Sequence, residues 1–315
     1  MSILMVFFST IVFLGPILSG SVSSWFLVWA GMELSFISFL PVMNYPKSSM
    51  SSESTIKYFL VQSCASAMIL VSGSFLFIVE MTNMFYYSLF LTGLMLKLGL
   101  VPFHFWVIPV MKGCKFTDMI FILGPMKIIP FLLIILSIPI SSNLLLIGIF
   151  MSLFSLVIGA LLGNNSSSVR GMLAASSIVH SGWLLMGCLV GGMGLYFSIY
   201  LMQLYPFLLF CLLNQKFFMS VLMLSFSGLP PFMLFFGKLY ILQNIIYKEV
   251  LVSLLFTFII FSALISLNFY LKFSYSFYLS SMLNLKNKIF ITNLMMISSL
   301  LGFILFIFFY GRAKH

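Results

Sequence analysis

Residues 96–106 read LKLGLVPFHFW and combine a charge, a glycine and a proline within one apolar stretch. Lys97 lies inside a run long enough to cross a bilayer, and Gly99 and Pro102 follow it. Proline removes a backbone hydrogen bond and clashes with the preceding turn, so a helix is expected to kink or break here. An ionisable group at the centre of a spanning helix costs about 2.5–3.5 kcal/mol on insertion scales. The stretch therefore predicts an interrupted membrane helix whose lysine serves a function.

The composition of the whole chain agrees with a membrane location. Of its 315 residues, 62% are hydrophobic and 6% are charged, and the mean hydropathy is +1.21. Soluble domains contain about 25% charged residues, so this chain has too few to cover a water-exposed surface. The longest polar interval, residues 44–57, is rich in serine, and we expect a loop there. The first apolar run, residues 3–18, lacks a basic flank and is expected to be a retained helix, not a signal peptide.

Apolar runs of about 20 residues recur along the chain, as spanning helices require. They predict an all-α polytopic membrane protein that forms a single integral membrane domain over residues 1–315. About eleven transmembrane helices are expected, and the fourth and ninth are longer than the others and carry Gly/Pro interruptions. The expected spans are residues 2–19, 22–43, 55–79, 83–109, 117–139, 142–163, 168–190, 193–213, 217–247, 250–273 and 289–310.

The ninth span contains a second interrupted stretch, SGLPPFMLFFGK at residues 227–238. Lys97 precedes its Gly/Pro element, whereas Lys238 follows the corresponding element. An inverted-topology repeat produces this mirrored order, and paired broken helices mark the working site of many transporters. We therefore expect an antiporter-like inverted repeat with two broken helices.

Basic residues in the loops predict the orientation of the chain. With eleven spans, nine of them fall on the side of the N-terminus: Lys47, Lys57, Lys112, Lys115, Arg170, Lys216, Lys272, Lys286 and Lys288. Three fall on the other side: Lys248, Arg312 and Lys314. The positive-inside rule then places the N-terminus on the cytoplasmic or matrix side. Because these residues are scattered singly through loops, the net charge of +10 indicates anionic lipid and not nucleic acid.

Five ionisable residues lie within expected spans, where each needs a reason: Glu33, Lys97, Lys127, His180 and Lys238. Such residues usually mark an ion or proton path. The protonation state of a buried lysine depends on whether a carboxylate lies nearby, so a lysine can change state when its neighbour moves. Structural alternatives remain, because Glu33 could be a hydrogen-bonding acid and a lone histidine in a helix is often structural.

Other polar residues have simpler explanations. Lys57, Lys216 and Lys272 lie near helix ends and can extend to the interface. His104 lies beside the proline break and is interpreted as structural, and Asp118 as a helix N-terminal acid.

The sequence shows no pattern for a metal or nucleotide site. Metal and iron–sulfur sites need clustered ligands, whereas the cysteines are far apart: Cys64, Cys114, Cys188 and Cys211. No glycine-rich nucleotide motif is present.

Five segments of the chain resemble the motifs of a known family in sequence and in order. They are residues 29–41 (WAGMELSFISFLP), 57–66 (KYFLVQSCAS), 96–107 (LKLGLVPFHFWV), 176–183 (SSIVHSGW) and 228–238 (GLPPFMLFFGK). Together they resemble the antiporter-like membrane subunits of respiratory complex I, in their mitochondrial form. The expected span count is similar to that of animal members.

The resemblance implies a role for each residue of the candidate relay. Glu33 matches the family's acidic partner of Lys97, and Lys127 matches the central relay lysine. His180 matches the histidine of the family's SSIxHxGW segment, and Lys238 the lysine of the second broken helix. One departure occurs at residues 108–110, IPV, where the family usually has Pro-Glu-Val. Any role of that loop glutamate is therefore missing here.

The function implied is that of a core membrane-arm subunit of the proton-translocating NADH:ubiquinone oxidoreductase. Protons would pass from Lys97 toward Lys127 once the pair with Glu33 is disturbed, and then by His180 to Lys238. NADH, FMN, iron–sulfur clusters and ubiquinone are expected in other subunits, and no cofactor or metal is expected in this chain. The expected partners are other membrane-arm subunits and lipids such as cardiolipin, in the mitochondrial inner membrane with the N-terminus in the matrix.

Two alternatives stay open at this point. A free-standing cation/proton antiporter would use the same lysines and broken helices. A purely structural membrane scaffold would tolerate neutral replacements of the buried lysines.

Overall fold

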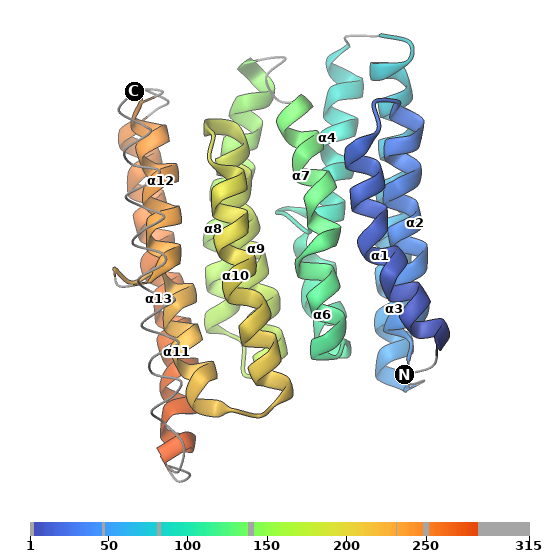
Figure 1. Cartoon of the computed structure of the whole chain (residues 1–315). Helices are drawn as coiled ribbons and strands as arrows, with labels where there is room; N and C mark the ends of the chain where they lie inside the picture. Colours follow the sequence, from blue (N-terminus) through green and yellow to red (C-terminus); the bar gives the residue numbers. More distant parts are fainter. Residues whose placement is uncertain are drawn as a thin grey trace.

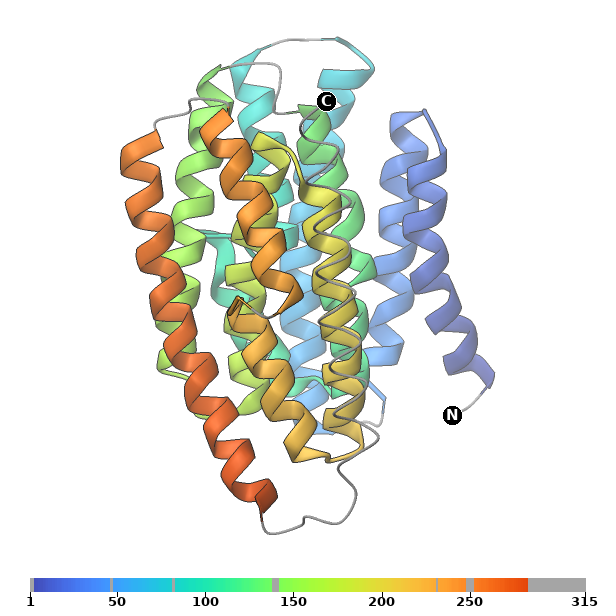
Figure 2. The same ribbon diagram turned by 60° about the vertical axis from the view of Figure 1, so that its left-hand side comes forward.

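The structure, a computed structural model, describes residues 3–45, 48–80, 83–137, 142–230, 232–247 and 252–282. Every regular element in these ranges is a helix, and the helices run side by side in an elongated bundle (Figure 1 and Figure 2). Their bounds are α1 Ile3–Ser21, α2 Trp25–Met43, α3 Ser49–Phe77, α4 Met84–Leu98, η1 Phe103–Trp106, α5 Val107–Gly113, α6 Phe116–Leu123, α7 Pro125–Ser137, α8 Ser142–Asn164, α9 Val169–Val190, α10 Met193–Leu212, α11 Lys216–Ser227, α12 Met233–Tyr247 and α13 Val252–Met282.

Most of the predicted spans have helical counterparts in the described residues. Nine segments of the described residues are long and apolar enough to cross a membrane, counting α4 to α5 and α6 to α7 as one segment each. The shorter pair α11 and α12 occupies the ninth predicted span. The eleventh predicted span, residues 289–310, lies outside the described residues.

The serine-rich interval is a helix start, so the prediction of a loop over residues 44–57 was wrong. The Ser48 hydroxyl accepts a hydrogen bond from the backbone nitrogen of Ser51, and the Ser51 side chain accepts one from the backbone of Ser48. Glu53 and Lys57 then form an ion pair one turn apart on the exposed side of α3. Serine is a strong N-cap residue, and a run of serines therefore starts a helix here.

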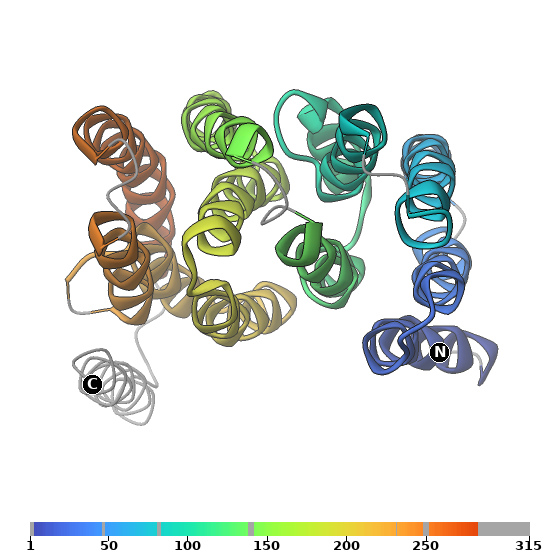
Figure 3. The same ribbon diagram turned by 90° about the horizontal axis from the view of Figure 1, so that it is seen from above.

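Seen along the helix axes (Figure 3), α1 to α3 lie at one end of the bundle and α11 to α13 at the other. Between them, α9 is the most enclosed span of the described chain, with nearly all its residues buried. Small residues allow this close packing. A Cβ atom at Gly159 of α8 would lie 2.9 Å from the backbone nitrogen of Val179 of α9, so only glycine fits there.

Both predicted breaks are present. Helix α4 ends at Leu98 and α11 at Ser227, and each is followed by a left-handed glycine, Gly99 with φ +68° and Gly228 with φ +76°. Glycine adopts this conformation without steric cost and commonly ends helices. The two broken helices run in opposite directions through the bundle (Figure 1), in agreement with an inverted repeat. Pro231 lies outside the described residues.

A third interruption was not predicted. The span expected as continuous over residues 117–139 divides at Gly124, where α6 ends and α7 begins with Pro125. Proline inside a helix clashes with the preceding turn, but it suits the first position of a new helix. The Gly-Pro pair at this point was the available signal.

The turns that join α5 to α6, α8 to α9 and α10 to α11 lie at the end of the bundle where the N-terminus lies (Figure 1). Three basic side chains join neighbouring segments by hydrogen bonds to carbonyl oxygens. Lys115 donates to Tyr45, Arg170 donates to Lys112, and Lys272 donates to Asn164. The three basic residues predicted for the other side, Lys248, Arg312 and Lys314, lie outside the described residues, so the loop asymmetry stays a prediction.

Candidate functional site

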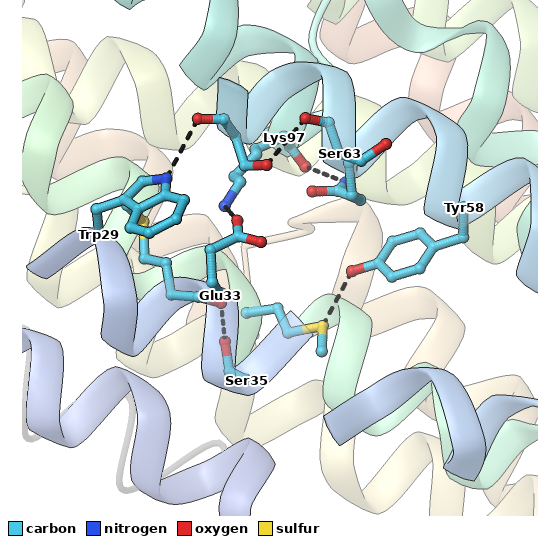
Figure 4. A network of polar contacts seen from close by, with 10 residues as sticks. Trp29, Glu33, Ser35, Tyr58, Ser63 and Lys97 are labelled. Atoms are coloured by element: carbon cyan, nitrogen blue, oxygen red, sulfur yellow. Dashed lines mark hydrogen bonds and ion pairs between the residues drawn. The ribbon is translucent and has the colours of Figure 1, made fainter. Parts of the chain in front are cut away.

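Lys97 and Glu33 form a buried ion pair, as predicted. Their Nζ and Oε1 atoms are 3.3 Å apart, and the side chains are 6% and 14% exposed (Figure 4). Lys97 lies in the last turn of α4, and Glu33 lies at the middle of α2. Removing one partner of such a pair leaves an uncompensated buried charge, which costs about 3–5 kcal/mol. The two charges are therefore strongly coupled.

The break after α4 leaves carbonyl oxygens to which neighbouring side chains donate hydrogen bonds. The Nε2 of Gln62 donates to the carbonyl oxygen of Lys97 at 3.2 Å, and the Nε1 of Trp106 donates to that of Leu96 at 3.0 Å. The last carbonyls of a helix have no partner within it, so these two donors stabilise the broken end. Both donors bond backbone oxygens, so the Lys97 ammonium remains free to pair with Glu33.

A cavity of about 30 Å³ connects the surroundings of Lys97 with those of Lys127. This volume suffices for roughly two water molecules, since one needs about 10–15 Å³ of accessible volume. The wall combines the two lysines with aromatic, proline, amide and hydroxyl side chains. The lining residues are Pro16, Met32, Ser35, Phe36, Tyr58, Gln62, Lys97, Trp106, Ile122, Pro125, Met126, Lys127, Ile129 and Pro130.

Lys127 extends from the start of α7 toward α9. Its side chain is 5% exposed, and its Nζ donates to the carbonyl oxygen of Ser177 at 3.4 Å. The break at Gly124 ends α6 just before this lysine. Lys127 therefore contacts the cavity on one side and the central helix on the other.

His180 lies in the middle of α9, and a tyrosine hydroxyl bonds each ring nitrogen. Nδ1 lies 2.8 Å from the hydroxyl oxygen of Tyr196, and Nε2 lies 3.0 Å from that of Tyr270. The rings of Tyr200 and Phe226 pack around the imidazole, which is 1% exposed. Sequence reasoning missed both tyrosines, because they belong to α10 and α13 and no local motif relates them to His180.

Lys238 reaches back across the second break. Its Nζ donates to the carbonyl oxygen of Ser227 at 2.8 Å and lies 5.7 Å from the centre of the Trp183 ring. The carbonyl end of α11 carries partial negative charge, and an aromatic face also attracts a cation. The ammonium is thus stabilised by a dipole and a ring.

The five predicted residues fall into two groups. Glu33, Lys97 and Lys127 belong to the pair and cavity, whereas His180 and Lys238 lie in the other half of the bundle. No direct hydrogen bond joins Lys127 to His180 or Lys238 in the described structure. His180 nevertheless lies within electrostatic range of both lysines.

Comparison with known proteins places this arrangement in a family. Residues 22–216 match the family model described as NADH:quinone oxidoreductase/Mrp antiporter, TM. The chain is 38% identical over 288 residues to NADH-ubiquinone oxidoreductase chain 2 of Albinaria caerulea, which covers 91% of this chain and 92% of the relative. The chain belongs to the NADH-ubiquinone oxidoreductase chain 2 family. Of the five site residues, only Lys238 lies beyond the part matched by the family model.

Solved structures share the fold of this family member. A chain of respiratory complex I from Thermus thermophilus superposes with a TM-score of 0.72 at 22% identity, over 83% of this chain and 67% of that one. A chain of the membrane-bound sulfane sulfur reductase, an archaeal respiratory membrane complex, superposes with a TM-score of 0.77 at 15% identity, over 96% of this chain and 72% of that one. The antiporter-like helical fold predicted from the sequence is confirmed.

The remaining polar residues have structural surroundings. Asp118 accepts a hydrogen bond from the backbone nitrogen of Lys115 at 3.2 Å, which confirms it as a helix N-terminal acid. His104 is buried beside the first break, and its Nδ1 has no hydrogen-bond partner in the described structure. Within the described ranges, no three His, Cys, Asp or Glu side chains cluster as metal ligands would.

Proposed function

We propose that this chain moves protons through the membrane arm of respiratory complex I, with Glu33, Lys97, Lys127, His180 and Lys238 as the relay. The ion pair of Lys97 and Glu33, together with the cavity that Lys97 shares with Lys127, carries the proposal. A buried lysine holds its proton more firmly beside a carboxylate than alone. Separation of the pair would therefore make the Lys97 proton available to water in the cavity, and Lys127 is the next acceptor.

The second half of the relay follows from the position of Lys127. Its contact with α9 directs the proton toward His180, and Lys238 receives it at the second break. Interrupted helices suit this task, because irregular backbone at membrane depth is tolerated where it lines a cavity. The signal that separates Glu33 from Lys97 would come from electron transfer in other subunits.

The decisive experiment replaces Lys97 by methionine, which keeps the length of the side chain and removes its proton. In assembled complex, Lys97→Met should lower proton-coupled quinone reduction by about 10²-fold or more, the scale of general acid–base effects. The matched control is Lys57→Met, because Lys57 is an exposed lysine paired with Glu53. Normal pumping by assembled Lys97→Met would mean that this lysine is structural.

The same proposal includes the membrane in which the chain lies, its orientation and its contacts. The whole chain forms one membrane domain of the mitochondrial inner membrane, and the basic end of the bundle, with the N-terminus, faces the matrix. That end would also attract anionic lipid headgroups such as those of cardiolipin, and no nucleic-acid role is assigned to it. The enzyme class is that of the proton-translocating NADH:ubiquinone reductase. NADH, FMN, iron–sulfur clusters and ubiquinone act in other subunits.

A free-standing cation/proton antiporter is the second candidate, favoured by the inclusion of Mrp antiporters in the matching family description. Native electrophoresis of solubilised membranes separates the two functions. Migration in a large species with NADH dehydrogenase activity supports the complex, and migration as an isolated small species supports the antiporter.

A further inference from the structure

The two tyrosines at His180 bond different ring nitrogens and come from different helices, α13 and α10. Tyr270 bonds Nε2, and its hydroxyl also interacts with the side chain of Ser176. The next residue along α9, Ser177, offers its carbonyl oxygen to Lys127. Tyr270 therefore contacts α9 at Ser176, one residue before the carbonyl group that Lys127 contacts.

Tyr196 bonds Nδ1 and lies toward the second break. Its ring stacks on Trp183 at a centroid distance of 6.2 Å, and Lys238 lies over the same Trp183 ring. A Cβ atom on Gly237, the neighbour of Lys238, would lie 3.1 Å from the Tyr196 ring. Tyr196 therefore connects His180 with the Lys238 side.

Each ring nitrogen of His180 is hydrogen-bonded to a tyrosine hydroxyl. A proton therefore reaches or leaves His180 through such a hydroxyl group. We propose that Tyr270 and Tyr196 are relay groups that pass protons into and out of His180. This inference rests on the proposed function and adds two residues to it. Neither tyrosine belongs to the set that the sequence motifs singled out.

The transfer balances without a charged tyrosine at its end. Take His180 with its proton on Nδ1 and a proton that enters through Tyr270. As Tyr270 receives a proton on its oxygen, its own hydroxyl proton moves to Nε2. The Nδ1 proton then moves to the oxygen of Tyr196, whose hydroxyl proton goes on toward Lys238. One proton enters and one leaves, both tyrosines stay neutral, and the ring must regain its first tautomer before another proton follows.

The test compares three tyrosine-to-phenylalanine variants in assembled complex. Tyr200→Phe is the control, because Tyr200 also packs on His180 at a centroid distance of 4.8 Å but its buried hydroxyl has no hydrogen-bond partner among the described residues. Tyr196→Phe and Tyr270→Phe should each lower the turnover coupled to pumping by up to about 10²-fold, the lower end of general acid–base effects. Tyr200→Phe should leave this turnover unchanged. Equal activity of all three variants overturns the inference.

Tyr196→His and Tyr270→His cover the case in which a phenylalanine variant does not assemble, because histidine can still accept and donate a proton. Assembled histidine variants that pump support the relay, and assembled ones that do not pump overturn it. Lys127→Met is measured alongside. Normal pumping by Lys127→Met contradicts the proposed function, whereas normal pumping by the two phenylalanine variants alone contradicts only the role of the tyrosines.

Discussion

Lys238 donates a hydrogen bond from its Nζ to the carbonyl oxygen of Ser227, 2.8 Å away, across the break between α11 and α12. The lysine is therefore held by the carbonyl end of the preceding half-helix, where the helix dipole is negative. The first break is arranged differently. There, Gln62 and Trp106 take the freed carbonyl oxygens, and Lys97 is paired with Glu33. The two buried lysines are thus stabilised by a backbone dipole in one half of the bundle and by a carboxylate in the other.

Replacement of Gly228 should disturb Lys238 directly. A Cβ atom at position 228 would lie 2.8 Å from the Lys238 Nζ, and the backbone φ of +76° is unfavourable for other residues. Gly228→Ala should therefore displace the ammonium from Ser227 and lower proton pumping in assembled complex. The matched control is Gly194→Ala, because a Cβ atom there meets nothing within 4 Å. Equal pumping by the two variants would show that the position of Lys238 is unimportant.

Glu33→Gln should slow proton-coupled quinone reduction less than Lys97→Met does. The amide keeps the shape of the side chain and removes the negative charge, while Lys97 can still exchange its proton. Rates of NADH oxidation and proton uptake in inner-membrane vesicles measure the effect. Glu53→Gln is the control, since Glu53 forms an exposed pair with Lys57. A Glu33→Gln variant as active as this control would argue against coupling through the pair.

Gln62→Leu should destabilise the broken end of α4. The substitution leaves the Lys97 carbonyl oxygen without the Gln62 donor and removes one amide from the cavity wall. Loss of one such bond costs about 1–2 kcal/mol, so thermal inactivation of the complex should occur at a lower temperature. Ser63→Ala, on the exposed side of the same helix, should leave that temperature unchanged. An unchanged inactivation temperature for Gln62→Leu would mean that the broken end needs no side-chain donor.

Cysteine labelling should confirm the orientation. Ser167 lies in the loop before α9, and Gly194 lies in the first turn of α10 at the opposite end of the bundle. Both positions are exposed. A Ser167→Cys variant should react with an impermeant reagent applied from the matrix side, and a Gly194→Cys variant only from the other side. Labelling of both from one side would contradict the assigned topology. The unsubstituted chain reports the background from its own cysteines.

Much of the fold could be predicted from the sequence, because the determining signals are local. The length of each apolar run predicts a span, and glycine followed by proline predicts a break, so the interruptions at Gly99 and Gly228 were correctly expected. Where a local signal was misinterpreted, the prediction failed. Gly124–Pro125 divides a span that was expected to be continuous, and Ser48 begins a helix where a loop was expected.

The site divides in the same way between sequence and tertiary structure. The sequence by itself determined which ionisable residues lie in lipid-spanning segments, because burying a charge there is costly and each such residue stands out. The resemblance already paired Glu33 with Lys97, and only the tertiary structure decided the other contacts: the cavity shared with Lys127 and the two tyrosines on His180. These contacts join side chains from different helices, whose relative rotation and depth depend on the packing of the whole bundle and leave no trace in any single segment.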